Sequence, residues 1–313
     1  MSEPNVEIEP NILQGIILAR QGNLPGAITA FSEAIRLHPE MASAYYNRGR
    51  SREDMGDMRG ALADYDQAIR LDPKYQLAYN NRAVARFTAG DLKGAMADWS
   101  QLLQLNPDFY EAYYNRSSLL ASLEQWSAAI ADLDQVIRLK SDFLPAYIRR
   151  GQAHLQAGGV QGALKDFDEA IRLNPQMADA YYARGMAYAQ LQTQAGLEQA
   201  IKELSEAIRL DPTHYQAYQD RGLLHFMLAT QFGHTDAAQK ALGDLSESVR
   251  LDSLFARYIR AQVYQHVGNP NEAISDLEQY LRAGGGSAYN NEAEVKALLK
   301  LLKEPSKPRW PWS

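Results

Sequence analysis

The 313-residue sequence contains no cysteine, which excludes disulfide bonds, thiolate nucleophiles and thiolate metal sites. It also has no run that approaches the ~18 apolar residues of a membrane-spanning helix. Residues 1–11 are acidic and lack the basic and apolar regions of a signal peptide, so we expect a cytoplasmic protein.

An excess of basic charge is missing as well. The formal net charge is −6 and the isoelectric point is about 5.6, a balance that does not favour binding to a nucleic-acid backbone. Hydrophobic residues make up 46% of the chain and charged residues 22%, as in folded globular proteins. We therefore expect a folded core and no nucleic-acid partner.

Signals for catalysis or cofactor binding are scarce. None of the six histidines lies in an H-x-x-x-H or H-E-x-x-H pattern, and no phosphate-binding G-x-x-x-x-G-K-[ST] loop occurs. Every serine, histidine and aspartate has a place in the repeat described next. We expect no catalytic residue, no metal and no cofactor.

The chain repeats itself with a period of 34 residues. Ala34–Pro39 returns at Ala68–Pro73, and Ala44–Gly49 returns at twice that distance as Ala112–Ser117. A fixed period of this length indicates a stack of similar units. Eight units follow: 8–41, 42–75, 76–109, 110–143, 144–177, 178–214, 215–253 and 254–287.

Each unit has the pattern of two amphipathic helices. Position 8 of every unit is Gly, Ala or Ser and position 20 is always Ala, which allows the backbones of two helices to approach closely. In the second unit Gly56-Asp57 separates the two helical patterns. Pro73 then ends the unit, because proline does not continue a helix.

This pattern resembles the tetratricopeptide repeat family, over about residues 8 to 287. The family has an aromatic residue at position 4, Gly or Ala at 8, Tyr at 11, Ala at 20, an aromatic residue at 24, Ala at 27 and Pro at 32. The sixth and seventh units depart from it by insertions near 192–196 and 229–237. The resemblance implies an all-α fold, an α-solenoid wound as a right-handed superhelix.

Position 7 is arginine and position 23 is acidic in seven units, whereas the first unit lacks both. Because the arginine and the acid occur together in seven units and are both missing from the first, we expect them to form an ion pair, either within one unit or between neighbouring units. Independent solvated charges are the alternative.

The family's concave groove is lined by positions 2, 5, 9 and 12 of the first helices and bordered by position 6. The groove residues that we expect to bind a partner are Tyr46, Asn47, Arg50, Asn81, Val84, Phe87, Tyr114, Asn115, Arg149, Leu155, Tyr182, Met186, Leu223 and Phe226. Asn47, Asn81 and Asn115 resemble an asparagine ladder that binds a peptide backbone; local helix packing is the alternative. The carboxylate clamp of some family members is not expected, because only its central asparagine is present.

The C-terminal groove positions are apolar, which is typical of a binding site, unless the insertions or the tail cover them. After the last unit we expect a flexible joint at 283–287 and a capping helix within 288–304. Its stripe is Val295, Leu298, Leu299 and Leu302, with Asn291 as N-cap. Residues 305–313 form a tail rich in proline and tryptophan.

We therefore expect a non-enzymatic scaffold or assembly cofactor that binds an extended or helical peptide segment of another protein. One alternative is a membrane-surface assembly factor held by the Trp310 and Trp312 tail. Another is a substrate-recruiting subunit of a separate enzyme.

Overall fold

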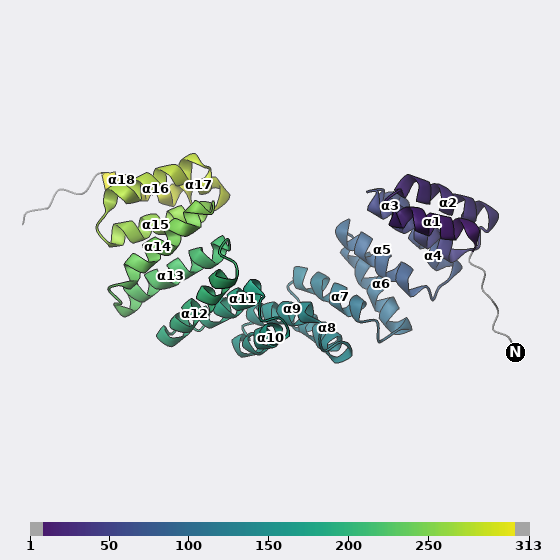
Figure 1. The fold of residues 1–313 in the computed structure, drawn as a ribbon, viewed down its shortest axis with the longest axis horizontal. Coiled ribbons are helices and arrows are strands. Elements are labelled where there is room, and N and C mark those ends of the chain that lie inside the picture. Colours follow the sequence, from purple (N-terminus) through teal and green to yellow (C-terminus); the bar gives the residue numbers. More distant parts are fainter. Residues whose placement is uncertain (1–8, 304–313) are drawn as a thin grey trace, which may run out of the picture. The chain divides into compact units, whose positions relative to one another are not determined.

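The computed structural model describes residues 9–303, which form eighteen α-helices and no strand. The helices follow one another in antiparallel pairs along the chain (Figure 1). The chain divides into two compact units, one that ends at Ala146 and one that begins at Tyr147. The tryptophan tail expected at 305–313 lies outside the described residues.

The helices of the N-terminal unit are α1 (Pro10–Arg20), α2 (Leu24–Leu37), α3 (Ala42–Asp54), α4 (Met58–Leu71), α5 (Gln76–Thr88), α6 (Leu92–Leu105), α7 (Tyr110–Ser122) and α8 (Trp126–Leu139). Helix α9 (Leu144–Gln156) begins at the boundary. The C-terminal unit continues with α10 (Val160–Leu173), α11 (Ala178–Ala189), α12 (Gln194–Leu210), α13 (Tyr215–Phe232), α14 (Ala237–Arg250), α15 (Leu254–His266), α16 (Pro270–Arg282), α17 (Gly285–Ala288) and α18 (Glu292–Lys303).

A two-residue signal ends the first helix of a pair and begins the second. Gly56 takes the left-handed backbone conformation at φ 85°, which glycine adopts without steric cost. The next residue, Asp57, then accepts a hydrogen bond from the backbone N–H of Gly60 and so caps α4. The fourth repeat lacks this signal: Glu124 takes a positive φ of 57° and Gln125 makes no side-chain cap.

The small residues lie where the two helices of a pair cross. Every alanine at position 20 is buried, with an exposed fraction of at most 1%. At position 8, a Cβ added to Gly49 would lie 2.9 Å from the Tyr65 ring. This confirms that the crossings exclude larger side chains.

The predicted arginine–acid pairs form within each of the seven repeats that carry both residues. Arg116 donates from Nε and Nη2 to the two carboxylate oxygens of Asp132, at 2.8 and 2.7 Å, and Asp132 is buried. The equivalent pairs are Arg48–Asp64, Arg82–Asp98, Arg150–Asp166, Arg184–Glu203, Arg221–Asp244 and Arg260–Asp276. Each guanidinium therefore holds the two helices of its own repeat together.

The same arginines also reach the preceding repeat. Arg116 Nη1 lies 3.4 Å from the Ser100 hydroxyl on α6, and Arg82 Nη1 lies 2.7 Å from Asp66 on α4. Arg48, Arg184, Arg221 and Arg260 make the equivalent contact to Ser32, Asp168, Ser205 and Ser246. One side chain thus joins three helices.

The segment 283–287, expected as a flexible joint, is folded. Gly284 is left-handed at φ 81° and is the N-cap of α17, in which Gly285 and Gly286 are buried. The expectation was wrong because these glycines permit close packing: a Cβ on Gly285 would overlap the Tyr280 ring. Asn291 directly precedes α18, and its carbonyl accepts from the backbone N–H of Val295. Its side chain accepts a hydrogen bond from the Tyr280 hydroxyl at 2.9 Å.

Helix α18 packs against α16 with the expected stripe. Val295 and Leu299 are buried, and Leu298 and Leu302 pack against the same core cluster as Tyr258 and Tyr280. The last repeat is therefore covered by an apolar helix face that belongs to the same chain.

Candidate functional site

The groove positions expected in the N-terminal unit lie on the first helices of its repeats, α1, α3, α5 and α7. Tyr46 is buried and does not expose a binding surface. Its ring lies 5.0 Å from that of Tyr75 and 6.0 Å from that of Tyr65, centroid to centroid. Burial raises the pKa of its hydroxyl, which accepts a hydrogen bond from Asn81 at 3.3 Å. Tyr46 therefore packs in the core and holds the Asn81 amide in place.

The three asparagines at position 6 are half-buried, and each amide N–H has an internal acceptor. Asn47 donates to the Ser43 carbonyl at 2.8 Å, on its own helix. Asn81 donates to Tyr46 and Asn115 to the amide oxygen of Asn80, both at 3.3 Å. One N–H of each amide is thus occupied, and the Asn81 amide also interacts with the Tyr65 hydroxyl.

Asn80, which sequence reasoning missed, connects two elements. Its amide oxygen accepts both from Asn115 and from the indole N–H of Trp99, at 3.3 and 3.2 Å. Val84 and Phe87 are half-buried, and the Phe87 ring lies 6.1 Å from that of Trp99. Tyr114 is half-buried with its ring edge-on to Phe143 at 5.1 Å. The middle of this groove is therefore aromatic and amide-rich.

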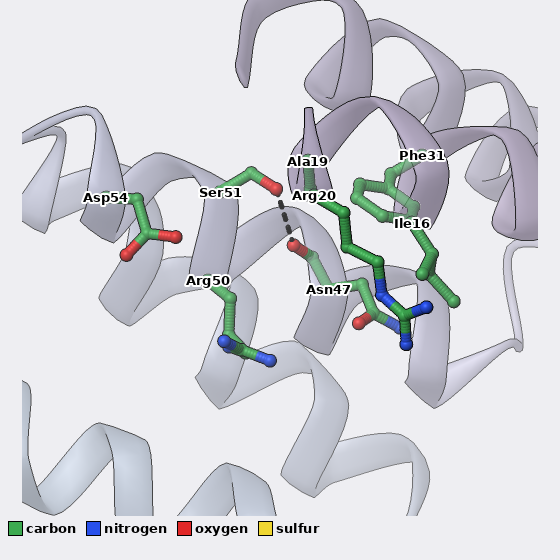
Figure 2. Close-up of a pocket in the computed structure, with 8 residues that line it drawn as sticks. All are labelled: Ile16, Ala19, Arg20, Phe31, Asn47, Arg50, Ser51 and Asp54. Atoms are coloured by element: carbon green, nitrogen blue, oxygen red, sulfur yellow. Dashed lines mark hydrogen bonds between the residues drawn. The ribbon is translucent and has the colours of Figure 1, made fainter. Parts of the chain in front are cut away.

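A cavity of about 400 Å³ opens between α1, α2 and α3. Its lining residues are Ile16, Ala19, Arg20, Phe31, Asn47, Arg50, Ser51 and Asp54 (Figure 2). The size falls in the ~300–1,000 Å³ range of ligand pockets. The Ser51 hydroxyl donates to the Asn47 carbonyl at 3.1 Å. Asn47 and Arg50, both expected in the groove, are therefore brought together with Arg20, which was not.

One groove position expected in the C-terminal unit carries a half-buried acid. Asp220, at position 6 of its repeat, accepts a hydrogen bond from the Tyr182 hydroxyl at 2.7 Å. Burial raises the pKa of Asp220, and burial together with the nearby Asp220 charge raises the pKa of Tyr182. The Tyr182 ring also packs on His214, with centroids 4.8 Å apart. The asparagine found at this position in three repeats of the N-terminal unit is here replaced by a carboxyl with a raised pKa.

The apolar positions of the C-terminal groove are half-buried. Leu155 packs against the cluster around Phe167, and Leu223 and Phe226 pack against the cluster around Leu245. Met186 and Arg149 are half-buried as well. Phe226 also meets the His266 ring edge-on at 5.5 Å.

A cavity of about 490 Å³ lies beside Phe226 and is lined also by Gln262, Gln265, His266 and Leu298. Because Leu298 belongs to α18, the capping helix forms one wall of it. Phe226 is therefore partly sheltered by the chain's own C-terminal helix.

Within residues 9–303 no group of three or more His, Asp and Glu side chains is arranged to hold a metal ion. No helix in that range is long and apolar enough to cross a membrane.

Comparison with known proteins gives a consistent result. Models of the tetratricopeptide repeat match residues 12–75, 46–99, 110–143 and 178–214, and a TPR repeat model matches residues 151–192. Together they cover more than half of the chain. No curated protein matches the sequence significantly.

Solved structures share the fold. YrrB, described as a TPR protein with an unusual peptide-binding site, is 26% identical over 61% of this chain and 97% of its own, with a TM-score of 0.55. The C-terminal part of a TPR repeat-containing protein from Cytophaga hutchinsonii is 15% identical over 76% of this chain and 94% of its own, with a TM-score of 0.65. A tetratricopeptide repeat protein from Parabacteroides merdae is 19% identical over 94% and 97%, with a TM-score of 0.50.

Proposed function

We propose that this chain, which belongs to the tetratricopeptide repeat family, binds a peptide segment of a partner protein along the groove face of its first helices. That it is a protein-interaction scaffold follows from the family. The finer claim concerns the place of binding.

The observation that carries the proposal is the row of half-exposed amides and aromatic residues on the first helices. The second N–H of Asn115 can donate to a peptide carbonyl without breaking the internal bond that holds the amide in place. Asn81, whose amide contacts Tyr46 and Tyr65, belongs to the same row. Phe87 and Tyr114 are half-buried on the same helices and add apolar contact area. YrrB, a TPR protein with an unusual peptide-binding site, supports this use of the fold.

The C-terminal unit is proposed to contribute a second, apolar part. Met186 and Phe226 offer half-buried apolar side chains, and a few such contacts usually dominate the free energy of an interface. Each unit would thus offer its own contacts: hydrogen bonds to a peptide backbone on the N-terminal unit, and apolar side chains on the C-terminal unit.

The test begins with a partner captured from native cell extract by the full chain and identified by mass spectrometry. Peptides covering the partner are then measured against wild type and four variants. Asn81→Ala and Asn115→Ala should each weaken binding by ~0.5–1.5 kcal/mol through a lost hydrogen bond. Met186→Ala and Phe226→Ala should weaken it more, because they remove apolar anchors.

Matched controls lie on the second helices. Lys93 on α6 and Lys165 on α10 are exposed, and Lys93→Glu and Lys165→Glu should leave binding unchanged. If binding survives all four groove variants but is lost on these charge reversals, the site lies on the opposite face and the proposal is wrong.

A further inference from the structure

The eighth repeat differs from the six before it at position 4, which is tyrosine in all of those six. In each of them the arginine at position 7 lies over that ring, as Arg150 lies over Tyr147 at 5.8 Å from the ring centroid. The eighth repeat has Arg257 at position 4, and its position-7 arginine, Arg260, lies over Tyr264 instead. A guanidinium group therefore replaces an apolar ring.

Position 29, on the second helix of a repeat, carries an arginine that is neutralised by its own helix in four repeats. Arg172 donates to the Glu169 carboxylate at 2.8 Å. The other three arginines that pair with the glutamate three residues earlier are Arg36, Arg209 and Arg250. The phenol of Tyr147 interacts electrostatically with both Glu169 and Arg172. Positions 4, 26 and 29 of one repeat are therefore neighbours in space.

The neutralising glutamate is replaced in the eighth repeat. Position 26 is Gln279, whose amide oxygen accepts a hydrogen bond from Arg257 Nη1 at 2.8 Å. Arg282, at position 29, is exposed and forms no ion pair within residues 9–303. Its charge reaches Glu278, one turn earlier, but that carboxylate is hydrogen-bonded to Lys303 at 2.6 Å. Arg282 therefore has no carboxylate of its own.

Arg257 is held in place while part of its guanidinium stays available. Nη1 also lies 3.8 Å from Asp276, a buried carboxylate whose two oxygens both accept from Arg260 at 2.7 Å. Nε and Nη2 of Arg257 have no acceptor among the described residues. Because Asp276 neutralises Arg260, the charges of Arg257 and Arg282 both remain uncompensated.

A cavity of about 270 Å³ lies among these side chains. It is lined by Arg257 on α15 and by Gln279, Arg282 and Ala283 on α16 and its C-terminal end, and the two helices form the last full pair of the array (Figure 1). Positions 4, 26 and 29 are not groove positions. This cavity is therefore separate from the peptide-binding face proposed above.

We propose that this cavity binds a phosphoryl group, with Arg257 and Arg282 donating to its oxygens and Gln279 keeping Arg257 in position. A phosphomonoester carries about −1.5 to −2 charges near neutral pH, which matches two uncompensated arginines better than a single carboxylate does. The forked N–H donors of a guanidinium also fit two phosphate oxygens at once. The group belongs either to a phosphorylated side chain of a protein or to free phosphate.

The test titrates the full chain with four probes and follows its ¹H–¹⁵N spectrum at neutral pH and constant ionic strength. Inorganic phosphate presents the group alone, and acetate presents a single negative charge. Acetyl-Gly-phosphoserine-Gly-amide presents the group on a peptide, and its unphosphorylated form is the neutral control. The signals read are the backbone amides of Arg257, Gln279, Arg282 and Ala283 and the Nε–H groups of the two arginines.

We expect saturable shifts at these signals with phosphate and with the phosphoserine peptide. Acetate should bind at least about tenfold more weakly, because it leaves one arginine uncompensated. The unphosphorylated peptide should cause no saturable shift. Tighter binding of the phosphopeptide than of phosphate assigns the site to a phosphorylated protein, whereas equal affinity assigns it to free phosphate.

Two variants restore what the other repeats have. Gln279→Glu supplies the carboxylate that pairs with position 29 in four repeats, and Arg257→Tyr supplies the ring of the six preceding repeats. Each should weaken phosphate binding about tenfold or more while the protein stays folded. Arg282→Gln should weaken it about fivefold or more. Arg172→Gln, at the equivalent position of the fifth repeat, should change nothing.

Any one of three results would overturn the proposal: no saturation with phosphate or the phosphopeptide, acetate binding as tight as phosphate binding, or unchanged phosphate affinity in Gln279→Glu. Signals outside α15 and α16 report whether each variant is folded. No groove residue is substituted here. The outcome is therefore distinct from that of the groove variants Asn81→Ala and Phe226→Ala.

Discussion

Arg116 shows how a single side chain can connect neighbouring repeats. It donates to both oxygens of Asp132 on α8 and reaches Ser100 on α6, and its guanidinium lies 5.7 Å from the centroid of the Tyr113 ring. Since Asp132 is buried, removing the arginine leaves a carboxylate without its counter-charge in a region of low polarity.

We therefore predict strong coupling between these two residues. Arg116→Ala and Asp132→Ala should each lower the free energy of unfolding by about 2 kcal/mol or more. The double variant should lose clearly less than the sum, because the second substitution removes a group that is already unpaired. Urea unfolding of the four proteins measures this. Arg138→Ala, at an arginine with 59% of its side chain exposed, should cost less than about 0.5 kcal/mol; strict additivity at Arg116 and Asp132 would contradict the pairing.

Asp220 should make the folded state less stable as the pH rises. Burial raises its pKa, so the folded state favours the protonated carboxyl. Its contribution to the free energy of unfolding is fully present below the pKa that Asp220 has in the unfolded state. That contribution is lost as the pH rises through the pKa of Asp220 in the folded state.

Asp220→Asn, which keeps an acceptor for the Tyr182 hydroxyl, should therefore raise the melting temperature at neutral pH. The gain should disappear as the pH falls toward about 4. Asp211→Asn is the control of opposite sign, because hydrogen bonds from Thr213 lower the pKa of Asp211. That variant should lower the melting temperature at neutral pH and converge with wild type in acid. A gain for Asp220→Asn that is independent of pH would show that its charge is not the cause.

At the scale of elements, the short helix α17 explains how the array ends. Its glycines let the chain pass directly over the Tyr280 ring, which is buried and stacks near Tyr258 with centroids 5.7 Å apart. Helix α18 can then return and lay Val295 and Leu299 on the last repeat. A larger residue at the turn would move the capping helix away from the core.

Gly285→Ala should accordingly destabilise the C-terminal cap by ~1–3 kcal/mol, because its methyl group overlaps the Tyr280 ring. Gly243→Ala is the matched control: it lies within α14 with nothing within 4 Å of an added Cβ. That substitution should be neutral or stabilise by up to about 1 kcal/mol, since alanine favours helix. Thermal unfolding and hydrogen exchange of α18 measure both, and equal behaviour of the two variants would refute this account.

At the scale of the whole molecule, contacts connect helices that are close in sequence. Within the N-terminal unit α1 packs on α2, α2 on α3, and so on to α8. In such an array, stability is approximately a sum of repeat and neighbour terms. A local defect should therefore weaken its own repeat most and distant repeats least.

Ala129→Leu tests this property. Ala129 is buried at the crossing of α7 and α8, and the added volume should destabilise by ~1–3 kcal/mol. Hydrogen exchange should accelerate in α7 and α8 and stay near wild type in α1 and α2. Ala128→Leu, at the exposed neighbouring position, should leave both regions unchanged. An equal acceleration in α1 and α7 would show that the unit unfolds as one.

Much of this protein could be predicted from its sequence because the informative features are local and repeated. The helix pairs follow from a 34-residue period, and the turn of Gly56 and Asp57 follows from the conformational freedom of glycine and the capping ability of aspartate. The pairing of Arg116 with Asp132 could be inferred because the first repeat lacks both the arginine and the acid at the equivalent positions.

Other features were decided only by how the helices pack. Tyr46 is at a groove position yet lies buried under Asn81, and Gly285 forms a helix where the composition alone indicated a joint. Arg20 and Arg50 line the same cavity although they lie on separate helices. Helix periodicity determines which side chains share one face, whereas the distance between crossing helices determines which faces meet and what remains exposed between them.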